Sequence, residues 1–440
     1  METVKNLIIG FGKGGKTLAK TLASHGEEVM VVEQSTQMYG GTCINVGCLP
    51  SKNMLINSER HLAFSDGVAH QRDLTSRLRQ KNYHMLADEP TVKVVDGQAH
   101  FVADHQVIID LSDGSTRQVE AARIFINTGA TPVIPDIPGL VLSHRVITSK
   151  EALSLDYQPK TMAILGAGHI GLEFATMYHQ YGTQVTVINR HDHLLRQYDE
   201  DVAQAVEADL KAADVCFKMN ANLVKIDETD DQVHLTFADG QTLTVDTLLV
   251  ASGRRPNTDQ LGLDQTGIQL TNRGAIQVDE HLQTTVPNVW ALGDVNGGPQ
   301  FTYISLDDFR IVNNQLFDDG SRSTSDRTVV PTTTFINPPL SVVGLSEKTV
   351  RQQGFDIKVY RLAAAGIPKA NVLEETRGLY KVIVDQKTSQ ILGAVIYAAE
   401  SYEVINLVAL AMKAKQPYTV LRDMIYTHPT MAEVFNDLLK

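Results

Sequence analysis

Cysteine and long apolar runs are both scarce in this 440-residue chain. With only three cysteines, it cannot build the disulfide framework of a small secreted protein, so we expect it to fold by packing in a reducing compartment, the cytoplasm. No stretch approaches the roughly 20 apolar residues that span a bilayer, which predicts no membrane partner. The apolar run near the N-terminus has only the length of a strand, too short for the core of a signal peptide.

Clustered positive charge is also missing. Lysine and arginine total 39 against 51 acidic residues, which gives a net charge of -12. Binding to nucleic acids depends on clustered cations that neutralise phosphates. We therefore expect no nucleic-acid partner. The length of the chain is enough for two or three domains, each with its own core.

A glycine-rich turn follows the first apolar run. In NLIIGFGKGGKTLA, Gly10, Gly12 and Gly15 form a GxGxxG pattern between a predicted strand and a predicted helix, and Glu33 ends the next apolar strand. Such glycines let a pyrophosphate approach the free N–H groups at the helix start, and the acid accepts hydrogen bonds from ribose hydroxyls. The complete strand–turn–helix–strand unit favours a dinucleotide site over a purely structural glycine turn.

The same unit occurs a second time, with one change. Gly166, Gly168 and Gly171 repeat the pattern, and Asn189 stands where the first copy carries its acid. Arg190 and Arg196 follow in the next loop. Without the carboxylate a ribose 2'-phosphate is not repelled, and arginines suit phosphate recognition. This predicts NADPH, with NADH possible; the alternative is that both arginines are solvated surface residues.

Two dinucleotide sites in one chain predict two cofactors that pass electrons. We expect a flavin dinucleotide (FAD) in the first copy and the nicotinamide dinucleotide in the second.

Two of the three cysteines lie five positions apart, in GGTCINVGCLPSK. In a regular helix, residues at this spacing are roughly 8 to 9 Å apart between Cα atoms, whereas a disulfide needs about 4.4 to 6.8 Å. Cys43 and Cys48 can therefore bond only across a distorted turn, which Gly47 makes easier. A strained disulfide is labile and suits redox cycling. The alternatives are a stapling disulfide or two free buried thiols. We expect the third cysteine, Cys216, to be a small buried residue.

The segment GGTCINVGCLPSK resembles the redox-active disulfide segment of the flavin disulfide reductases, the pyridine nucleotide-disulfide oxidoreductase family that includes glutathione reductase, dihydrolipoamide dehydrogenase and mercuric reductase. Further segments similar to this family follow in order: FINTGA, LLVASGRRPNT, WALGDV and THPTMAE. The resemblance covers essentially the whole chain. GFGKGGKTLA, MYGGTCIN and FTYISLDDFRIV look most like the RclA-type branch, which is associated with resistance to reactive chlorine species and with reduction of hypothiocyanous acid and copper(II).

The resemblance implies roles for the residues around the cysteines. Cys48 is similar to the flavin-proximal thiolate and Cys43 to the exposed interchange thiol. Lys52 is similar to the lysine beside flavin N5, and Glu173 to its ion-pair partner. The cofactor-binding residues that we expect are Gly10, Gly12, Gly15, Glu33, Gly41, Thr42, Lys52, Thr128, Gly129, Gly166, Gly168, Gly171, Glu173, Asn189, Arg190, Arg196, Gly253, Gly293 and Asp294.

Near the C-terminus, His428 and Glu433 resemble the acid–base pair of the family. An imidazole oriented by a carboxylate can take and return a proton near neutral pH. The resemblance implies that the pair acts across a homodimer, on the thiols of the other subunit. His169 stands where many relatives carry a tyrosine that gates the nicotinamide pocket. Tyr426 replaces a second histidine that is usual in dihydrolipoamide dehydrogenases.

The expected fold class is α/β, with two Rossmann-like dinucleotide-binding domains and a C-terminal α+β dimerisation domain. We expect an FAD-binding domain in residues 1–147, a nicotinamide domain in 148–270, a second part of the FAD-binding domain in 271–327, and the dimerisation domain in 328–440.

The chain lacks the N-terminal CxxC module of mercuric reductase, the C-terminal cysteine pair of large thioredoxin reductases, and counterparts of the arginines that grip glutathione. We therefore expect a small-molecule oxidant, hypothiocyanous acid or a related reactive chlorine or sulfur species, to react directly at the interchange thiol. The alternatives are a copper(II) or other metal-ion reductase, a disulfide reductase similar to dihydrolipoamide dehydrogenase or glutathione reductase, and a flavoprotein redox sensor. No resident metal is expected.

Overall fold

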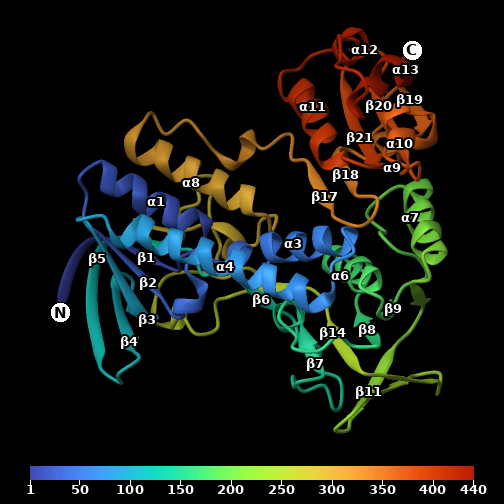
Figure 1. Ribbon diagram of the computed structural model, residues 1–440. Coiled ribbons are helices and arrows are strands. Elements are labelled where there is room, and N and C mark those ends of the chain that lie inside the picture. Colours follow the sequence, from blue (N-terminus) through green and yellow to red (C-terminus); the bar gives the residue numbers. More distant parts are fainter. The chain divides into compact units, whose positions relative to one another are not determined.

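The computed structural model describes residues 1–440, and the chain divides into two compact units. The first consists of Met1–Ile134, Ser149–Tyr157 and Gly253–Asp326, and the second of Pro135–Thr148, Gln158–Ser252 and Arg327–Lys440. Each unit contains one of the two glycine-rich turns, set in a mixed α/β arrangement (Figure 1). The α/β fold class is confirmed. The expected domain edges at residues 147, 270 and 327 stay predictions.

The first unit is built on a largely parallel sheet. β1 pairs with β2 on one side and β5 on the other, β3 follows β2, β16 follows β5, and β4 joins β3 to β5 in an antiparallel meander. The bounds of these strands are β1 Glu2–Ile9, β2 Val29–Glu33, β3 Val92–Ala103, β4 Gln106–Leu111, β5 Thr116–Ile126 and β16 Val289–Ala291.

Both faces of this sheet are covered, which is why its central strands read as unbroken apolar runs. Successive side chains of β1 point to opposite faces. Leu7 and Ile9 enter one core, and Ile8 enters the other, which it shares with residues of three helices. Those helices are α1 (Lys13–Ser24), α4 (Phe64–Ala87) and α8 (Thr302–Phe317). Shorter elements of this unit are α2 Thr42–Asn45, α3 Cys48–Glu59, α5 Ser149–Ala152, β6 Ala130–Pro132 and β15 Arg254–Pro256.

The second unit begins with a five-stranded parallel sheet in the order β10-β9-β8-β14-β7. Helix α6 (His169–Gln180) joins β8 to β9, so the turn and the helix repeat the geometry of the first unit. A three-stranded antiparallel sheet, β11-β12-β13, follows α7 (Glu200–Ala212). The strands are β7 Val146–Thr148, β8 Thr161–Leu165, β9 Gln184–Ile188, β10 Cys216–Lys218, β11 Leu223–Glu228, β12 Val233–Phe237, β13 Thr242–Val245 and β14 Thr247–Val250.

Cys216 corrects one expectation. It is exposed rather than buried. The reason is its place at the start of β10, the edge strand of the parallel sheet, which pairs only with β9.

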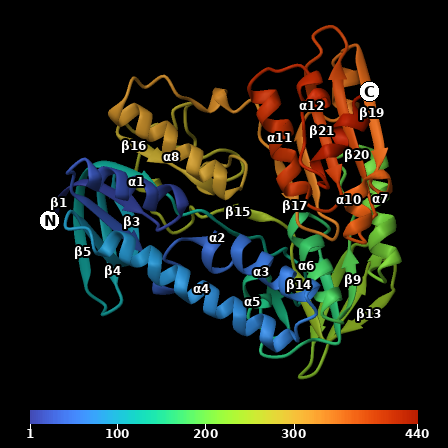
Figure 2. The ribbon, with the colours of Figure 1, turned by 45° about the horizontal axis from the view of Figure 1, so that its top comes forward.

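The remainder of the second unit is an antiparallel sheet in the order β17-β18-β21-β20-β19, packed against α11 (Figure 2). The strands and helices of this part are β17 Thr332–Thr334, β18 Leu340–Gly344, β19 Ile357–Ala363, β20 Leu379–Asp385, β21 Ile391–Tyr397, α9 Glu347–Gln352, α10 Pro368–Val372, α11 Ser401–Lys413, α12 Thr419–Asp423 and α13 Phe435–Leu438. Their apolar side chains form one continuous core. No helix of the chain is both long enough and apolar enough to cross a membrane.

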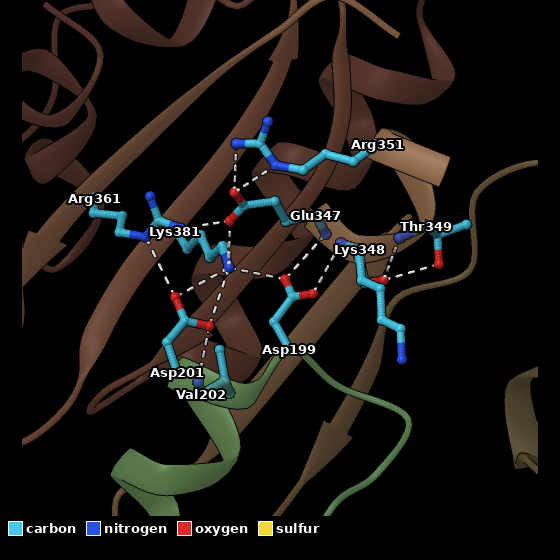
Figure 3. A network of polar contacts seen from close by, with 10 residues as sticks. Asp199, Asp201, Val202, Glu347, Lys348, Thr349, Arg351, Arg361 and Lys381 are labelled. Carbon is cyan, nitrogen blue, oxygen red and sulfur yellow. Dashed lines mark hydrogen bonds and ion pairs between the residues drawn. The ribbon is translucent and has the colours of Figure 1, made fainter. Parts of the chain in front are cut away.

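A buried lysine fastens α7 to this antiparallel sheet (Figure 3). Lys381 on β20 is 1 % exposed, and its ammonium lies 2.9 Å from Asp199, 3.1 Å from Asp201 and 2.9 Å from Glu347. Asp199, just before α7, also accepts hydrogen bonds from the backbone N–H groups at the start of α9. Because Asp199 directly follows the loop that carries the two arginines, the network fixes the end of that loop.

We expect Lys381→Met to lower the free energy of unfolding by about 3 to 5 kcal/mol, because three carboxylates would lose their buried cation. Urea unfolding at pH 7 measures the change, and Lys387→Met, at an exposed position just after β20, should change it by less than about 0.5 kcal/mol.

Acid should weaken the same network. Burial opposes the charge of Glu347, but hydrogen bonds from Lys381 and Arg351 outweigh it and lower the pKa of Glu347 to about 2. A carboxylate with a depressed pKa stabilises the fold above its ordinary pKa, and this contribution is lost as the pH falls toward 2. The stability difference between wild type and Lys381→Met should therefore shrink below about pH 4. A difference that is constant between pH 7 and pH 3 would contradict this.

Candidate active site

The first glycine turn has the geometry of a dinucleotide cradle. Gly10 has a positive φ of 101°, and a Cβ there would lie 2.5 Å from the Asn127 carbonyl oxygen. Gly12 is the N-cap of α1 and offers no capping side chain. A Cβ on Gly41 would lie 2.8 Å from the Cα of Gly12, so Gly41 can approach Gly12 this closely only as a glycine. The N–H groups of Gly14 and Gly15 are held by Ser305 and Asn127, and the missing capping side chain at Gly12 leaves room for a pyrophosphate at the very start of the helix.

Glu33 ends β2 beside this turn, as predicted for a ribose ligand. One carboxylate oxygen accepts from the N–H of Phe11 at 3.0 Å and the other from Ser35 at 3.1 Å. Burial raises the pKa of Glu33, and these N–H groups counteract it. The bonds fix the carboxylate in place at the edge of the turn.

Asn127 is a residue that the sequence reasoning missed. It directly follows β5, and its amide oxygen accepts from the N–H of Gly15 at 2.9 Å while its amide nitrogen donates to the Leu292 carbonyl. It therefore joins the glycine turn to the WALGDV segment. A polar residue at the carboxyl end of a strand next to β1 was the only available signal.

The other residues expected around FAD also lie in the first unit. The Thr128 hydroxyl donates to the Asn257 carbonyl at 2.9 Å, and Gly129 and Gly253 have positive φ. The N–H of Gly293 donates to Asp308 at 2.6 Å. Burial raises the pKa of Asp294, while the charge of Arg254 lowers it. Together with the turn, Glu33 and Asp294, these residues fit an FAD molecule.

The chain bends sharply between the two cysteines. Helix α2 ends at Asn45 and α3 begins at Cys48. Between them Gly47 adopts φ -130° and ψ -121°, and a Cβ there would lie 2.8 Å from the Thr42 carbonyl oxygen. The predicted distortion is confirmed, and glycine is required for it. Both cysteines are free thiols.

The two thiols interact strongly, and the interaction shifts their pKa values in opposite directions. A hydrogen bond from Cys48 is the largest cause that lowers the pKa of Cys43, to about 6; burial opposes it, and Thr302 and Lys16 assist. The same bond raises the pKa of Cys48. The Thr302 hydroxyl lies 3.9 Å from the sulfur of Cys48. The lowered pKa of Cys43 and the raised pKa of Cys48 therefore favour a single thiolate, stabilised by the hydrogen bond within the pair.

Lys52 lies one helical turn after Cys48 on α3. Its ammonium donates to the Ser51 hydroxyl at 3.4 Å, and its charge acts to lower the pKa of Cys48. Glu173, on α6 in the second unit, accepts from the N–H of Phe335 at 2.9 Å. Lys52 belongs to the first unit and Glu173 to the second, and the ion pair expected between them stays a prediction.

The second glycine turn repeats the first. Gly166 has a φ of 118°, and a Cβ there would lie 2.5 Å from the Ala251 carbonyl oxygen. Gly171 is equally confined, with 2.0 Å between its added Cβ and the Gly166 carbonyl oxygen. Gly168 caps α6 with no side chain. This turn too leaves an uncapped helix start for a pyrophosphate.

Asn189 and the following loop form a cluster of positive charge. The Asn189 amide donates to the His193 carbonyl at 3.1 Å, which holds the loop. Arg196 lies 3.0 Å from Nδ1 of His191, and Arg190 lies 3.3 Å from its Nε2. Partial desolvation and then the charges of Arg196 and Arg190 lower the pKa of His191. Asp192 in the same loop pairs with His193 and also interacts with the charge of Arg196, so the loop carries two arginines against one carboxylate and suits an anion.

His428 is exposed and already oriented. Its Nδ1 lies 2.9 Å from Glu433, which leaves Nε2 directed to the surface. His169, at the start of α6, pairs through Nδ1 with the hydroxyl of Thr334 and makes an edge contact with Tyr198. The imidazole of His169 is therefore held by β17.

The fold and this set of sites define a flavin-dependent oxidoreductase, and comparison with known proteins shows the family. The description "Pyridine nucleotide-disulphide oxidoreductase" matches residues 4–308, and the dimerisation domain of the same family matches 330–439. The chain belongs to this family, whose members use FAD and a nicotinamide cofactor.

Among the relatives, the chain is 45 % identical over 438 residues to an Escherichia coli protein described as "probable pyridine nucleotide-disulfide oxidoreductase RclA", covering 100 % of this chain and 99 % of that one. It is 32 % identical to a mercuric reductase of Staphylococcus aureus, covering 97 % of this chain and 80 % of that protein. A solved structure of a "Cu(II) complex of HOCl-induced flavoprotein disulfide reductase RclA" from E. coli matches with a TM-score of 0.97 and 44 % identity, over 100 % of this chain and 99 % of that one.

Proposed function

We propose that this flavoprotein is a homodimeric, NADPH-dependent reductase of hypothiocyanous acid or a related reactive chlorine or sulfur oxidant. The observation that carries the proposal is the dithiol at the broken helix, in which Cys43 is partly exposed and has a pKa lowered to about 6. A thiolate that is present at neutral pH is the nucleophile that attacks an electrophilic sulfur or chlorine atom. The similarity to a protein described as HOCl-induced supports this class of substrate.

The two cradles divide the cofactors between the units. The first turn, with Glu33 and Asp294, would hold FAD, which supplies a two-electron relay between the nicotinamide and the disulfide when bound. The second turn would hold the nicotinamide dinucleotide. The positive charge of Lys52 would stabilise negative charge beside Cys48.

The two thiols reduce the oxidant in two successive reactions. The Cys43 thiolate attacks the sulfur of hypothiocyanous acid, an S–S bond forms as the S–O bond breaks, and the departing hydroxide takes a proton from His428 and leaves as water. Cys48 gives its proton to the now neutral imidazole of His428, and the resulting thiolate attacks the sulfur of Cys43, closes the disulfide and releases thiocyanate. The two cysteines lose two electrons and the oxidant gains two.

The acid–base pair would act across the dimer. Glu433 accepts from Nδ1 of His428, which fixes the tautomer and leaves Nε2 to give and take the proton. We assign the pair to the thiols of a second copy of the chain, because the family's dimerisation domain is present at residues 330–439.

A stoichiometric titration tests this proposal. Protein reduced with NADPH, freed of excess reductant and treated with one equivalent of hypothiocyanous acid should lose two free thiols and release one equivalent of thiocyanate. Thiol counting and ion chromatography measure the two quantities. Loss of thiols without thiocyanate release, or oxidation to sulfinic acid, would refute the mechanism.

The preference for NADPH is tested at Arg190. We expect Arg190→Glu to lower kcat/KM for NADPH roughly 10- to 100-fold, because a charge-assisted bond to the 2'-phosphate is replaced by repulsion. NADH, which has no 2'-phosphate, should be little affected or improved. Lys225→Glu, a charge reversal on the exposed edge of β11, is the matched control. Equal kinetics with both cofactors in Arg190→Glu would contradict the assignment.

Copper(II) reduction is the second candidate, favoured by one observation. The similar E. coli structure is described as a Cu(II) complex, and soft thiolate ligands favour Cu(I), the product of one-electron reduction of that ion. Within the single chain, no group of three or more His, Cys, Asp and Glu side chains is arranged to hold a metal. A copper ion would therefore be a substrate, and because a Cu(II) complex is also described for the C43S variant of the E. coli protein, its binding there does not require the intact dithiol.

A further inference from the structure

The loop that carries the two arginines of the second unit ends in a tight turn. Leu195 adopts a positive φ of 49°, and its carbonyl accepts from the N–H of Tyr198 at 2.8 Å. Leu194 and Leu195 are both buried, so they fasten the turn on its N-terminal side. Arg196 lies inside the turn, and its guanidinium lies 3.0 Å from Nδ1 of His191. The direction in which Arg196 points therefore depends on how both ends of the turn are held.

Asp199 holds the other end of this turn with a side chain that leaves its own helix uncapped (Figure 3). An aspartate at the N-cap of a helix ordinarily accepts a hydrogen bond from an N–H group of that helix. The carboxylate of Asp199, at the N-cap of α7, makes no such bond. It accepts instead from the backbone N–H groups of Glu347 at 3.0 Å and Lys348 at 3.1 Å, and from the ammonium of Lys381 at 2.9 Å. At this position, contacts with distant residues replace local capping.

These distant residues belong to the part of the chain that matches the dimerisation domain of the family, and this part contacts the second glycine-rich unit at another point. Thr334 on β17 is buried and pairs with Nδ1 of His169, the first residue of α6. The ring of His169 makes an edge contact with Tyr198, at 6.3 Å between ring centroids, and Tyr198 directly precedes Asp199. Residues of β17, β20 and α9 therefore hold both the start of α6 and the end of the arginine loop.

We infer that Asp199 is a positioning residue for cofactor selectivity: fixed by Lys381 and by the start of α9, it holds the turn that presents Arg196 to the 2'-phosphate of NADPH. A guanidinium makes its strongest phosphate contacts in one fixed geometry, because its donors lie in a rigid plane. NADH has no 2'-phosphate, so the same positioning adds nothing to its binding. The inference rests on the proposed preference for NADPH.

The other charges of the network supply the matched control. Lys381 binds Asp201 at 3.1 Å and Glu347 at 2.9 Å as well as Asp199. Asp201 lies within α7 and Glu347 begins α9, so Asp199 is the one of the three carboxylates that adjoins the arginine loop. A change of charge at Glu347 disturbs the same lysine without touching the turn.

Isothermal titration calorimetry of the FAD-loaded enzyme tests the inference with two nucleotides, adenosine 2',5'-bisphosphate and AMP, which lacks the 2'-phosphate. We expect wild type to bind the bisphosphate more tightly than AMP. Asp199→Asn keeps the shape of the side chain and removes its charge, so it should weaken binding of the bisphosphate roughly 5- to 30-fold and change the affinity for AMP by less than about twofold. Glu347→Gln removes one charge from the same lysine and keeps the backbone N–H that Asp199 accepts, so both of its affinities should equal those of wild type.

Asp199→Ser is a second variant, which keeps the test decisive if Asp199→Asn does not fold. Serine caps a helix about as well as aspartate, so α7 keeps its start while the contacts with Lys381 and α9 are lost, and the same selective loss is expected.

Three results would overturn the inference: unchanged affinity for the bisphosphate in both Asp199 variants, an equal loss for both nucleotides, or an equal loss in Glu347→Gln. If wild type itself binds the two nucleotides equally, the proposed NADPH preference fails and the inference fails with it. A tighter affinity for the bisphosphate that both Asp199 variants retain would refute the inference alone.

Discussion

Replacing Cys43 with serine should abolish reduction of hypothiocyanous acid, with a loss in kcat on the order of 1,000-fold or more. A serine hydroxyl does not ionise near neutral pH, so the hydrogen bond from Cys48 and the charge of Lys16 have no thiolate to stabilise. Stopped-flow measurement of NADPH oxidation with hypothiocyanous acid gives the result. The electron supply upstream of the thiols should survive, so reduction of bound FAD by NADPH in a single turnover should persist.

Two variants separate this prediction from a general effect of cysteine loss. Cys216→Ser, at an exposed position on the edge strand β10, should have wild-type turnover. In Cys48→Ser, Cys43 should attack the oxidant once and the reaction should then stop, with the SCN group bonded to Cys43, because no second thiol remains to release thiocyanate. Full turnover in Cys43→Ser would contradict the mechanism, and so would an adduct on any cysteine other than Cys43.

Replacing His428 with alanine should lower kcat for hypothiocyanous acid by roughly 10²- to 10⁴-fold, the usual contribution of a general acid. The departing hydroxide would then have to take its proton from water. The matched control is His84→Ala, because His84 is also exposed and also lies close to a carboxylate, 3.1 Å from Asp88. Its turnover should equal that of wild type.

The same variant distinguishes the two candidate substrates. Copper(II) accepts electrons without a leaving group that needs a proton, so its reduction should survive His428→Ala far better than that of hypothiocyanous acid. Equal losses with both substrates would show that the imidazole acts on the dithiol itself rather than on the leaving group. Glu433→Gln should give a smaller loss, since it disturbs only the orientation of His428.

Local constraints explain why much of the fold was predictable. Gly10 and Gly166 take positive φ values within short turns, and the strands before them are buried on both faces. The glycine and apolar patterns in the sequence therefore predict the backbone conformation of the same few residues. The break between Cys43 and Cys48 was also a local matter, because five helical positions exceed the reach of a disulfide.

Contacts between distant residues explain what the sequence did not reveal. Asn127 meets Gly15 across 112 positions, and Lys16 meets Asn82 across 66, and neither pairing has a periodic signal. Cys216 looked apolar and was predicted to be buried, but strand order, which places β10 at an edge, decided its exposure. The three carboxylates around Lys381 likewise come from segments that only the folded chain brings together.

The central claim is that a small oxidised sulfur or chlorine species reacts directly at Cys43. The most direct measurement is NADPH oxidation by the purified FAD-loaded protein with hypothiocyanous acid, copper(II), oxidised glutathione and lipoamide compared in parallel at equal concentrations. The account predicts rapid turnover with hypothiocyanous acid that is lost in Cys43→Ser, and slow turnover with both disulfides. Little turnover with hypothiocyanous acid beside rapid reduction of a disulfide or of copper(II) would contradict it, while leaving the family assignment in place.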